Sequence, residues 1–391
     1  MTRLFSEPYE FYYEVRVFLS RMPQERVRNT ASNRRLWFLG ALPPPLNGQS
    51  NANAAMLDNL SDRSIINVLP LGVTLTSKIW RGLANAAILA CRVRAGDRAY
   101  LSVPGQAGSW LLLPAVLTLR LRGAAMWFHH HSYRSINRWP LRGIKALVAA
   151  AGRAQHHLLL SPGMRNRFAA LYLSGDRGRA LSLSNAFLFG TTTAAPPKIR
   201  ADRPPTLGHA SVLTRAKGVF YLLDLFERLL VSVPEACLVI AGPCADTDLL
   251  AAIEAAVRRH PTAIEYRGMV VGMAKQAFYG DIDLFVLPTT LVDEAEPLVM
   301  FEAYAAGVDV MAADTGCIAD RIRARECLLT LDLTHDTELI KHRLERMTSD
   351  WEEARAANRA HLNAISVEAE NEASSFLGLL FDDPKPKIAK E

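Results

Sequence analysis

The sequence predicts an α/β protein built from two doubly wound domains, and three observations lead to this fold class. The chain has 391 residues, more than one hydrophobic core usually holds. Apolar runs of strand length alternate with helix-length segments on both sides of residues 191–206. Residues 191–206 themselves contain two proline pairs and no apolar period, so we expect a linker there.

The clearest strands are apolar runs that end in a turn, a polar residue or a histidine and are followed by a helix-length segment. In the front half these runs lie at 36–39, 99–103, 124–128 and 157–160. In the back half they lie at 238–243, 264–268, 284–288 and 310–313. Both sheets should be parallel, because successive strands are joined through helices.

These elements divide the chain into five parts. The expected boundaries are 1–33 for an N-terminal extension, 34–190 for the first domain, 191–206 for the linker, 207–364 for the second domain and 365–391 for a final helix and tail. The extension carries aromatic residues among scattered charges, which fits either an amphipathic interfacial helix or a helix packed on its own domain. In the final helix, Phe376, Leu379, Leu380 and Phe381 form an apolar stripe.

Charge is distributed unevenly along the chain. Residues 1–190 carry 24 Lys and Arg against 8 Asp and Glu, while 191–391 carry 21 against 31. A one-sign surface favours anionic partners such as phospholipid headgroups or nucleic acid. No nucleic-acid-binding signature is present in the sequence. We therefore predict an anionic membrane surface as a partner of the basic first domain and no nucleic acid, against the alternative of a solvated basic face without a partner.

Cysteine usage and hydropathy indicate a protein of the cytoplasm. The five cysteines are an odd number without metal-like spacing, as expected in a reducing compartment. The longest apolar runs are well short of the ~20 residues of a spanning helix, and acids interrupt the N-terminus where a signal peptide would lie. The expected location is cytoplasmic, with peripheral attachment to the inner face of the cytoplasmic membrane.

The most informative segment follows the apolar run 284–288. A short acidic loop leads to a helix that we expect to open at Pro297 and close at Gly307, since proline suits a first helical position and glycine the left-handed residue after the last turn. Glu294 in the loop and Glu302 on the helix are eight positions apart. Both carboxylates should lie near the carboxyl edge of the sheet, where open α/β sheets bind ligands.

The segment resembles the Glu-x7-Glu element of retaining glycosyltransferases of family 4. The residues around it, 283–288, 302–307 and 312–316, follow the family pattern in the same order. The resemblance is strong over about 207–320 and loose over 36–190. It implies the GT-B fold, in which two Rossmann-like domains face a cleft and the C-terminal helix crosses back to the first domain.

The resemblance also implies roles for the acidic segment. Glu302 would accept hydrogen bonds from the ribose diol of a nucleotide-diphosphate sugar, and Glu294 would lie beside the donor sugar. The loop residues 295–296 and the backbone N–H groups at the helix start, where Pro297 and Leu298 stand, would hold sugar hydroxyls and phosphate. Glu296 stands where the family more often has an aromatic residue, so it either changes the charge of the sugar pocket or is only a surface acid.

The diphosphate would be held by a basic loop. Lys217, with Arg215 beside it, resembles the family's phosphate loop, whose positive charge stabilises the departing diphosphate. The alternative for Lys217 is an exposed lysine before a helix. The family often has Arg or Asn five residues before the lysine, but Val212 stands there and can donate no side-chain hydrogen bond, which places catalytic efficiency in doubt.

Two segments of the first domain complete the expected site. A family histidine at the end of the strand 124–128 faces the donor sugar, and His131 matches best, with His130 second and a purely structural histidine as the alternative. Gly48 follows the first strand in a loop where the backbone can approach a phosphate or acceptor. We expect no metal, because adjacent histidines of a strand point to opposite faces and the Asp-x-Asp runs at 246–248 and 281–283 are interpreted as structural.

The sequence therefore predicts a hexosyltransferase that moves a sugar from a nucleotide-diphosphate donor to a glycan or lipid-linked acceptor with retention of configuration. The donor is a substrate, and no cofactor is expected. One alternative is a GT-B scaffold at the membrane with weak or no catalysis, which Val212 and the single-glycine loop favour. Another is a nucleotide-sugar epimerase of the same fold.

Overall fold

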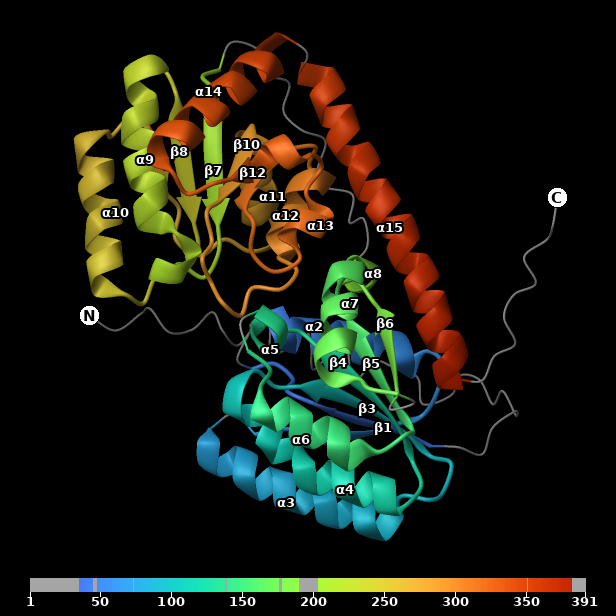
Figure 1. Ribbon diagram of the computed structural model, residues 1–391. Coiled ribbons are helices and arrows are strands. Elements are labelled where there is room, and N and C mark those ends of the chain that lie inside the picture. The colour runs from blue at the N-terminus through green and yellow to red at the C-terminus, as the bar shows by residue number, and fades with distance from the viewer. Residues whose placement is uncertain are drawn as a thin grey trace, which may run out of the picture. The chain divides into compact units, whose positions relative to one another are not determined.

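The structure is a computed structural model, and it describes residues 35–44, 48–72, 74–137, 139–175, 178–189, 203–349 and 351–381. The extension 1–33, most of the linker 191–206, and the tail beyond residue 381 lie outside the described residues, so the predictions for them stay predictions. Within the described residues the chain forms two six-stranded sheets, and every strand pair in both is parallel (Figure 1).

The first sheet has the strand order β2-β1-β3-β4-β5-β6. Its strands are β1 (Leu36–Gly40), β2 (Ile66–Pro70), β3 (Arg98–Val103), β4 (Ala125–His130), β5 (Gln155–Leu159) and β6 (Arg179–Ser182). The strands β1 and β3 are buried along their whole length, as expected for parallel strands that helices cover on both faces.

Helices cover both faces of this sheet. One face packs against α3 (Leu75–Arg92), α4 (Leu113–Leu121), α6 (Arg142–Ala151) and α7 (Pro162–Tyr172), and the 3₁₀ helix η1 (Gln106–Leu112) leads into α4. The other face packs against α2 (Gly48–Ser61), α8 (Ala186–Phe189) and the end of the last helix. The short helix α5 (Arg134–Asn137) follows β4.

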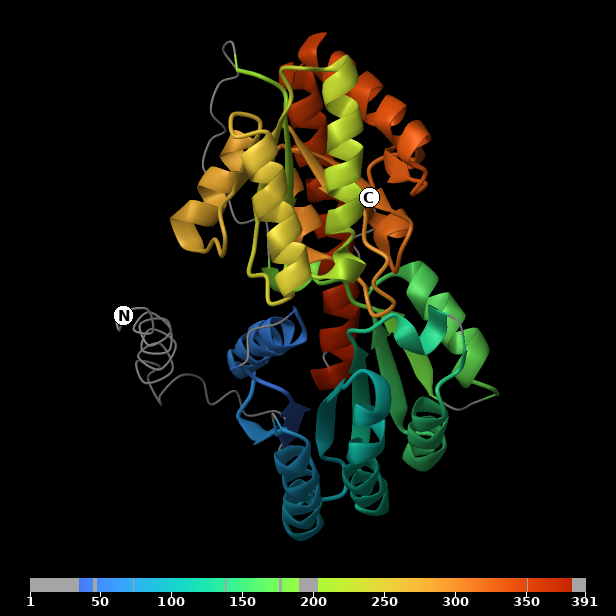
Figure 2. The same cartoon turned by 90° about the vertical axis from the view of Figure 1, so that its left-hand side faces the viewer.

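The second sheet has the strand order β12-β11-β10-β7-β8-β9. Its strands are β7 (Thr206–Ala210), β8 (Cys237–Ala241), β9 (Ile264–Tyr266), β10 (Leu284–Leu287), β11 (Asp309–Ala313) and β12 (Leu328–Leu329). Its helices are η2 (Arg215–Lys217), α9 (Val219–Ser232), α10 (Thr247–Arg259), α11 (Gly272–Asp281), α12 (Leu298–Ala305), α13 (Ile318–Arg321), η3 (Arg325–Cys327) and α14 (Leu333–Ser349). Figure 2 looks onto α9 and α10, which lie on one side of this sheet.

The last helix joins the two domains. Helix α15 (Trp351–Phe381) has 31 residues and begins earlier than the predicted boundary at 365. It contacts α12, α14 and β11 of the second domain and then α8 and β6 of the first (Figure 1). Phe376, Leu377 and Leu380 are buried in one cluster with Leu36 and Phe38 of β1. The predicted crossover helix is therefore confirmed.

The predicted strands match observed ones at all eight positions. The strands β2, β6, β7 and β12 were not predicted, and β7 begins at Thr206, the last residue of the predicted linker. Three of the four unpredicted strands lie at sheet edges, where β2 and β6 have mixed exposure and β12 has only two residues. The fourth, β7, is central, but Gly208 and His209 interrupt its apolar run. Edge strands are short and lack the continuous apolar run that marks a central parallel strand.

Replacing Phe376 by alanine should lower the free energy of unfolding by about 3–5 kcal/mol, because the ring is fully buried and its loss leaves a cavity. Urea denaturation followed by circular dichroism measures the change. Val367→Ala is the control, since Val367 lies on the same helix with 59 % of its surface exposed. Equal stability of the two variants would contradict the packing of α15 on the first sheet.

Candidate functional site

The carboxyl ends of β7 and β10 bring together two of the predicted site residues. The chain passes from β7 to β8 on one side and returns to β10 on the other side of β7, which makes β7/β10 the topological switch point of the second sheet. Ligands of open α/β sheets bind outside the strand ends at such a point. Lys217 follows β7, and Glu294 follows β10.

Lys217 and Glu294 form an ion pair at this edge. The Lys217 Nζ lies 2.5 Å from Glu294 Oε2, and the two side chains are 16 % and 9 % exposed. The Thr289 hydroxyl donates to the same carboxylate oxygen at 3.2 Å. Both charged groups are largely buried. The Glu294 carboxylate, held by the Thr289 hydroxyl, fixes the position of the Lys217 ammonium at the switch point.

Two glycines allow the loops to approach closely. Gly218 has φ 79°, and a Cβ there would lie 2.0 Å from the Pro288 carbonyl oxygen. Gly316 has φ 67°, and a Cβ there would lie 2.3 Å from the carbonyl oxygen of Glu294. Only glycine meets both demands, a left-handed backbone and a missing Cβ. The loops after β7, β10 and β11 are thus packed backbone to backbone around Glu294.

Glu302 makes its contacts on another helix. Its carboxylate pairs with Lys275 Nζ, and it accepts a hydrogen bond from the Tyr279 hydroxyl at 2.8 Å. Lys275 and Tyr279 are four residues apart and therefore share one face of α11. The Glu302 side chain is 32 % exposed, so it is only partly buried at this edge of the helix.

Helix α12, which carries Glu302, has bounds close to the predicted ones. It begins at Leu298, with Pro297 as the N-cap residue, so the proline lies one position before the expected first helical residue. Gly307 has φ 76° and ends the helix as predicted. The first N–H groups of a helix have no partner within it, and at Leu298 they lie at the end of the acidic loop.

The first domain reaches the acidic loop through the segment after β4. Asp293 accepts hydrogen bonds from the Ser132 hydroxyl at 2.8 Å and from the Arg134 guanidinium at 2.8 and 2.7 Å. His131 precedes Ser132, and both line a small cavity with Gly105. His131 therefore lies beside the residues that meet the loop of Glu294, although its own Nε2 has no partner among the described residues.

The histidines at the end of β4 are held neutral by burial. Burial lowers the pKa of His131 from 6.5 to about 4, and burial together with the charge of His131 lowers the pKa of His130 to about 3. His130 Nε2 lies 3.0 Å from His157 Nδ1 on β5, and His129 Nδ1 lies 2.6 Å from the Tyr100 hydroxyl. His130 is thus part of the core, and His131 is the one at the loop.

The other predicted residues lie apart from the ion pair. Arg215 is paired with Asp246 and Asp248 at the start of α10, each at 2.7 Å, and Asp246 is the N-cap of that helix. Gly48 is exposed at the first residue of α2 with open space around it. Val212 is 60 % exposed and supplies no polar group, as expected from its side chain.

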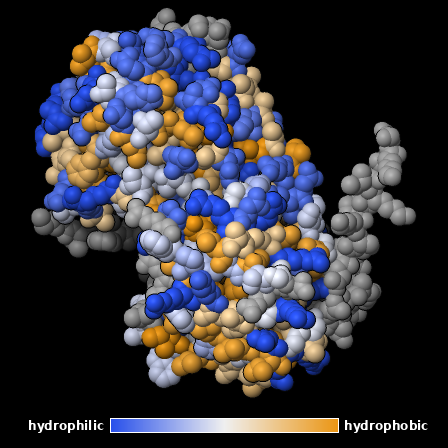
Figure 3. Space-filling view, in the orientation of Figure 1, coloured by the Kyte–Doolittle hydropathy of each residue, from blue (hydrophilic) through white to orange (hydrophobic). Residues whose placement is uncertain are grey.

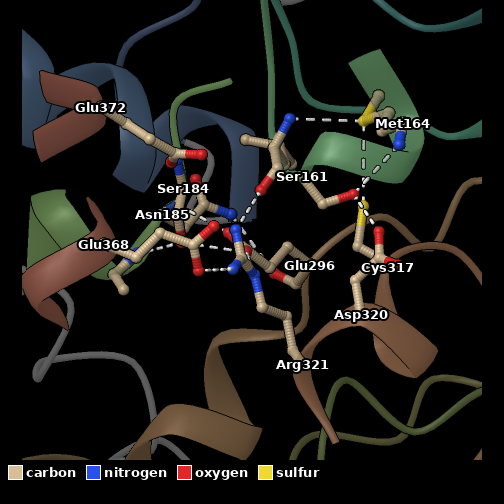
Figure 4. Close-up of polar contacts among 12 residues, drawn as sticks. Ser161, Met164, Ser184, Asn185, Glu296, Cys317, Asp320, Arg321, Glu368 and Glu372 are labelled. Atoms are coloured by element: carbon tan, nitrogen blue, oxygen red, sulfur yellow. Dashed lines mark hydrogen bonds and ion pairs between the residues drawn. The ribbon is translucent and has the colours of Figure 1, made fainter. Parts of the chain in front are cut away.

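Glu296 contradicts the prediction of a sugar-pocket or surface acid. Its carboxylate is buried and accepts hydrogen bonds from Arg321 Nε at 2.6 Å, from the Ser184 hydroxyl at 2.9 Å and from the Asn185 backbone N–H at 2.6 Å (Figure 4). Burial raises the pKa of this carboxyl, while the Arg321 guanidinium opposes the shift. Glu296 therefore joins the second domain to the first.

Arg321 extends the same network across the domains. Its side chain is 2 % exposed, and it donates to Leu160 O of the first domain at 2.9 Å and to Glu368 of α15 at 3.2 Å (Figure 4). Beside it, Ser161 donates to Asp320 at 2.5 Å. A buried guanidinium with this many acceptors fixes α13 against the end of β5.

Sequence reasoning missed several of these partners. Lys275 and Tyr279 had a detectable signal in their four-residue spacing between two predicted strands, and Asp293 is adjacent to Glu294. Ser184 and Arg321 had none, because their partner Glu296 lies far away in sequence. Thr289 is only five residues from Glu294, but nothing in the sequence shows that the loop folds back on itself there. Within the described residues, no group of three or more His, Cys, Asp or Glu side chains is placed to hold a metal ion.

The comparisons with known proteins agree on the architecture. The Alr3699/HepE protein of Anabaena, solved with UDP and glucose, superposes with a TM-score of 0.66 at 13 % identity over 89 % of this chain and 100 % of that one. The α,α-trehalose-phosphate synthase of Burkholderia vietnamiensis gives 0.62 at 14 % identity, over 89 % and 99 %. The chain has the GT-B fold.

The sequence of the second domain matches a known family. Residues 204–350 match the family model described as glycosyl transferases group 1. The pneumococcal O-GlcNAc transferase GtfA, solved with UDP and GlcNAc, has a TM-score of 0.58 at 15 % identity over 77 % of this chain and 60 % of that one. No curated protein sequence matches the chain. The matched range contains Lys217, Glu294 and Glu302 of the GT-B second domain.

Replacing Arg321 by leucine should destabilise the protein by about 3–5 kcal/mol, because the Glu296 carboxylate would remain buried without its counter-charge. Adding Glu296→Gln should recover part of the loss, since the amide carries no charge. Urea unfolding measures both variants. Arg325→Leu, at an exposed position nearby, should change stability by no more than about 0.5 kcal/mol, and a loss as large as that of Arg321→Leu would contradict the assigned role of the pair.

Acid should weaken the protein between pH 6.5 and about 4, the interval set by the lowered pKa of His131. The unfolded chain binds a proton at this histidine near pH 6.5 and the folded chain only near pH 4, so stability is full above the interval and is lost as pH falls. In His131→Gln the unfolding free energy should depend less steeply on pH in this interval. The decrease in slope should correspond to the uptake of up to one proton fewer on unfolding. An unchanged slope would show that His131 is not buried in its neutral form.

Proposed function

We propose that the protein is a glycosyltransferase that moves a sugar from a nucleotide-diphosphate donor to an acceptor with retention at the anomeric carbon. The observation that supports this most strongly is the Lys217–Glu294 pair at the switch point of the second sheet. It lies inside the range that matches group 1 glycosyl transferases. The donor class is favoured by HepE and GtfA, both solved with UDP.

Each residue has a chemical task in this proposal. Lys217, fixed by Glu294, neutralises charge on the diphosphate as the bond from the anomeric carbon to phosphate oxygen breaks. The carboxylate of the partly exposed Glu302 side chain accepts hydrogen bonds from the ribose diol, with Lys275 and Tyr279 fixing its orientation. The helix start at Leu298 offers N–H groups to the donor.

The acceptor would enter from the first domain. The anomeric carbon forms its new bond to an acceptor hydroxyl oxygen, and the hydroxyl proton passes to the leaving phosphate oxygen on the same face of the sugar. His131, neutral at pH 7, is proposed to lie against the sugar beside the Asp293 loop. The basic charge of the first domain favours a lipid-linked or cell-envelope glycan intermediate as acceptor and a cytoplasmic protein at the inner membrane face.

A second function, a GT-B scaffold at the membrane with weak or no catalysis, is favoured by two observations. Val212 supplies no donor to a phosphate, and Arg215 is occupied by Asp246 and Asp248. The phosphate clamp then depends on Lys217 alone among the predicted basic residues. Transfer assays with purified protein separate this function from the first.

The test begins with a thermal-shift panel of UDP-, GDP- and ADP-sugars, because a ligand that binds only the folded state raises the melting temperature by mass action. Glu302→Gln should weaken binding of the stabilising donor by about tenfold, the loss of a charge-assisted hydrogen bond. Lys217→Met should lower the transfer rate by about 100-fold, as loss of an electrostatic stabiliser does in other sites.

Glu235→Gln is the matched control, because Glu235 is an exposed carboxylate of the same domain. Its donor binding and transfer rate should equal those of the unaltered protein. Unchanged rates and affinities in both Glu302→Gln and Lys217→Met would contradict the assignment. Donor binding without any transfer or hydrolysis would favour the scaffold.

A further inference from the structure

Helix α3 has an apolar exposed face, which is unusual for a helix on a protein surface. Ile79, Trp80, Leu83 and Ile88 are 44 %, 73 %, 52 % and 37 % exposed. They recur at helical spacing along one side of the 18-residue helix. The opposite side of the helix carries Leu89 into the core. The exposed residues are therefore not needed to attach α3 to its sheet.

The neighbouring segment η1–α4 continues this apolar surface. Trp110, Leu117 and Leu121 are 48 %, 47 % and 86 % exposed, at spacings of seven and four residues. Helix α3 packs against α4 and also contacts η1. We call these seven residues the α3–α4 face, and Figure 3 shows hydrophobic residues gathered over the region where Figure 1 places α3 and α4. Contiguous exposed apolar surface of this kind marks an interaction site.

The charges around the α3–α4 face all have one sign. The sequence has no Asp or Glu from 98 to 175 and none within α3. Lys78, Arg81 and Arg92 lie on α3, and Arg120 and Arg122 lie on or just after α4. Two copies of this chain meeting through the face would bring like charges together, at a cost. Charge complementarity therefore selects an anionic partner.

An arginine-lined pocket lies at the end of the same face. Its lining includes Arg35, Arg92, Arg94 and Arg122 together with Leu121 of the α3–α4 face. Among the described residues no carboxylate forms an ion pair with any of the four guanidinium groups. The Asp97 carboxylate, which is buried, accepts hydrogen bonds from the backbone N–H groups of Arg35 and Arg94. Two of the guanidinium groups contact carbonyls at the end of α3, with Arg35 donating to Arg92 O at 3.5 Å and Arg122 donating to Ala90 O. The remaining donors suit phosphate oxygens.

We propose that the α3–α4 face docks on an anionic lipid bilayer, with its tryptophans and aliphatic side chains at the headgroup–acyl boundary and the arginine pocket on lipid phosphates. Tryptophan prefers this boundary, and an amphipathic helix with a basic rim lies in the plane of the interface. No helix among the described residues is long and apolar enough to cross a membrane. Docking would bring the acceptor-binding domain to a lipid-linked acceptor, and in this respect the inference rests on the proposed function.

Co-sedimentation of the full chain with vesicles tests the docking. Equal parts of phosphatidylglycerol and phosphatidylcholine should bind the protein at low salt, and pure phosphatidylcholine should not. Trp80→Ser with Leu83→Ser should weaken binding by more than about tenfold, the loss expected for two buried apolar side chains. Arg92→Gln with Arg122→Gln should weaken binding and reduce its salt dependence. Val231→Ser, on α9 and 85 % exposed, is the matched control and should bind normally.

Several outcomes would overturn the inference. These are no binding to anionic vesicles, equal binding to neutral ones, undiminished binding by the Trp80 and Leu83 variant, or a dimer that this variant dissociates. Donor-sugar thermal shifts are measured in parallel and should be unchanged, because the altered residues lie outside the nucleotide-sugar site. Sugar transfer without vesicle binding would contradict only the docking. Vesicle binding without a thermal shift from any donor sugar would contradict only the proposed function.

Discussion

The structure depends on one short segment, residues 293–296, that is held from both domains at once. Asp293 binds the loop after β4 of the first domain, and Glu294 binds Lys217 of the second. The carbonyl of Ala295 accepts from Cys317 N at 2.7 Å, and Glu296 is buried between Arg321 and the start of α8. Successive residues therefore have partners in different parts of the chain, and the position of Glu294 is fixed by its neighbours as well as by its own ion pair.

This arrangement explains why the segment holds three carboxylates in four positions. Burying a charge is costly unless it is paired and hydrogen-bonded, and each of the three meets a different cation, namely Arg134, Lys217 and Arg321. A site built in this way is preorganised, since its charged groups need not reorient when a diphosphate arrives. Asp293 and Glu296 contact the first domain, and Glu294 between them contacts Lys217 of the second. A change in the separation of the two domains would therefore change the position of Glu294.

Much of the fold could be predicted from the sequence because central parallel strands are continuous apolar runs. The edge strands β2, β6 and β12 lack that signal and were missed, as was the central strand β7, whose sequence Thr-Leu-Gly-His-Ala is not a continuous apolar run. In the site, Glu294 could be placed after the apolar run 284–288, whereas Lys217 was proposed from its resemblance to a phosphate loop, because the strand before it was not predicted. The burial of Glu296 could not, since it depends on Arg321 and Ser184, which are distant in sequence and contribute only after the domains have met. The partners of Arg215 escaped prediction for a similar reason.

The crossing of α15 has a consequence for how the protein is made. Phe376 and Leu380 belong to the same buried cluster as Leu36 and Phe38 of the first strand. Synthesis proceeds from the N-terminus, so the earliest strand leaves the ribosome long before the helix that covers it. Helices α2 and α8 can cover part of that face early, but the part that α15 covers stays exposed while the entire second domain is translated. Nascent chains of this protein therefore carry exposed apolar surface for most of their elongation, the condition in which chaperones are needed.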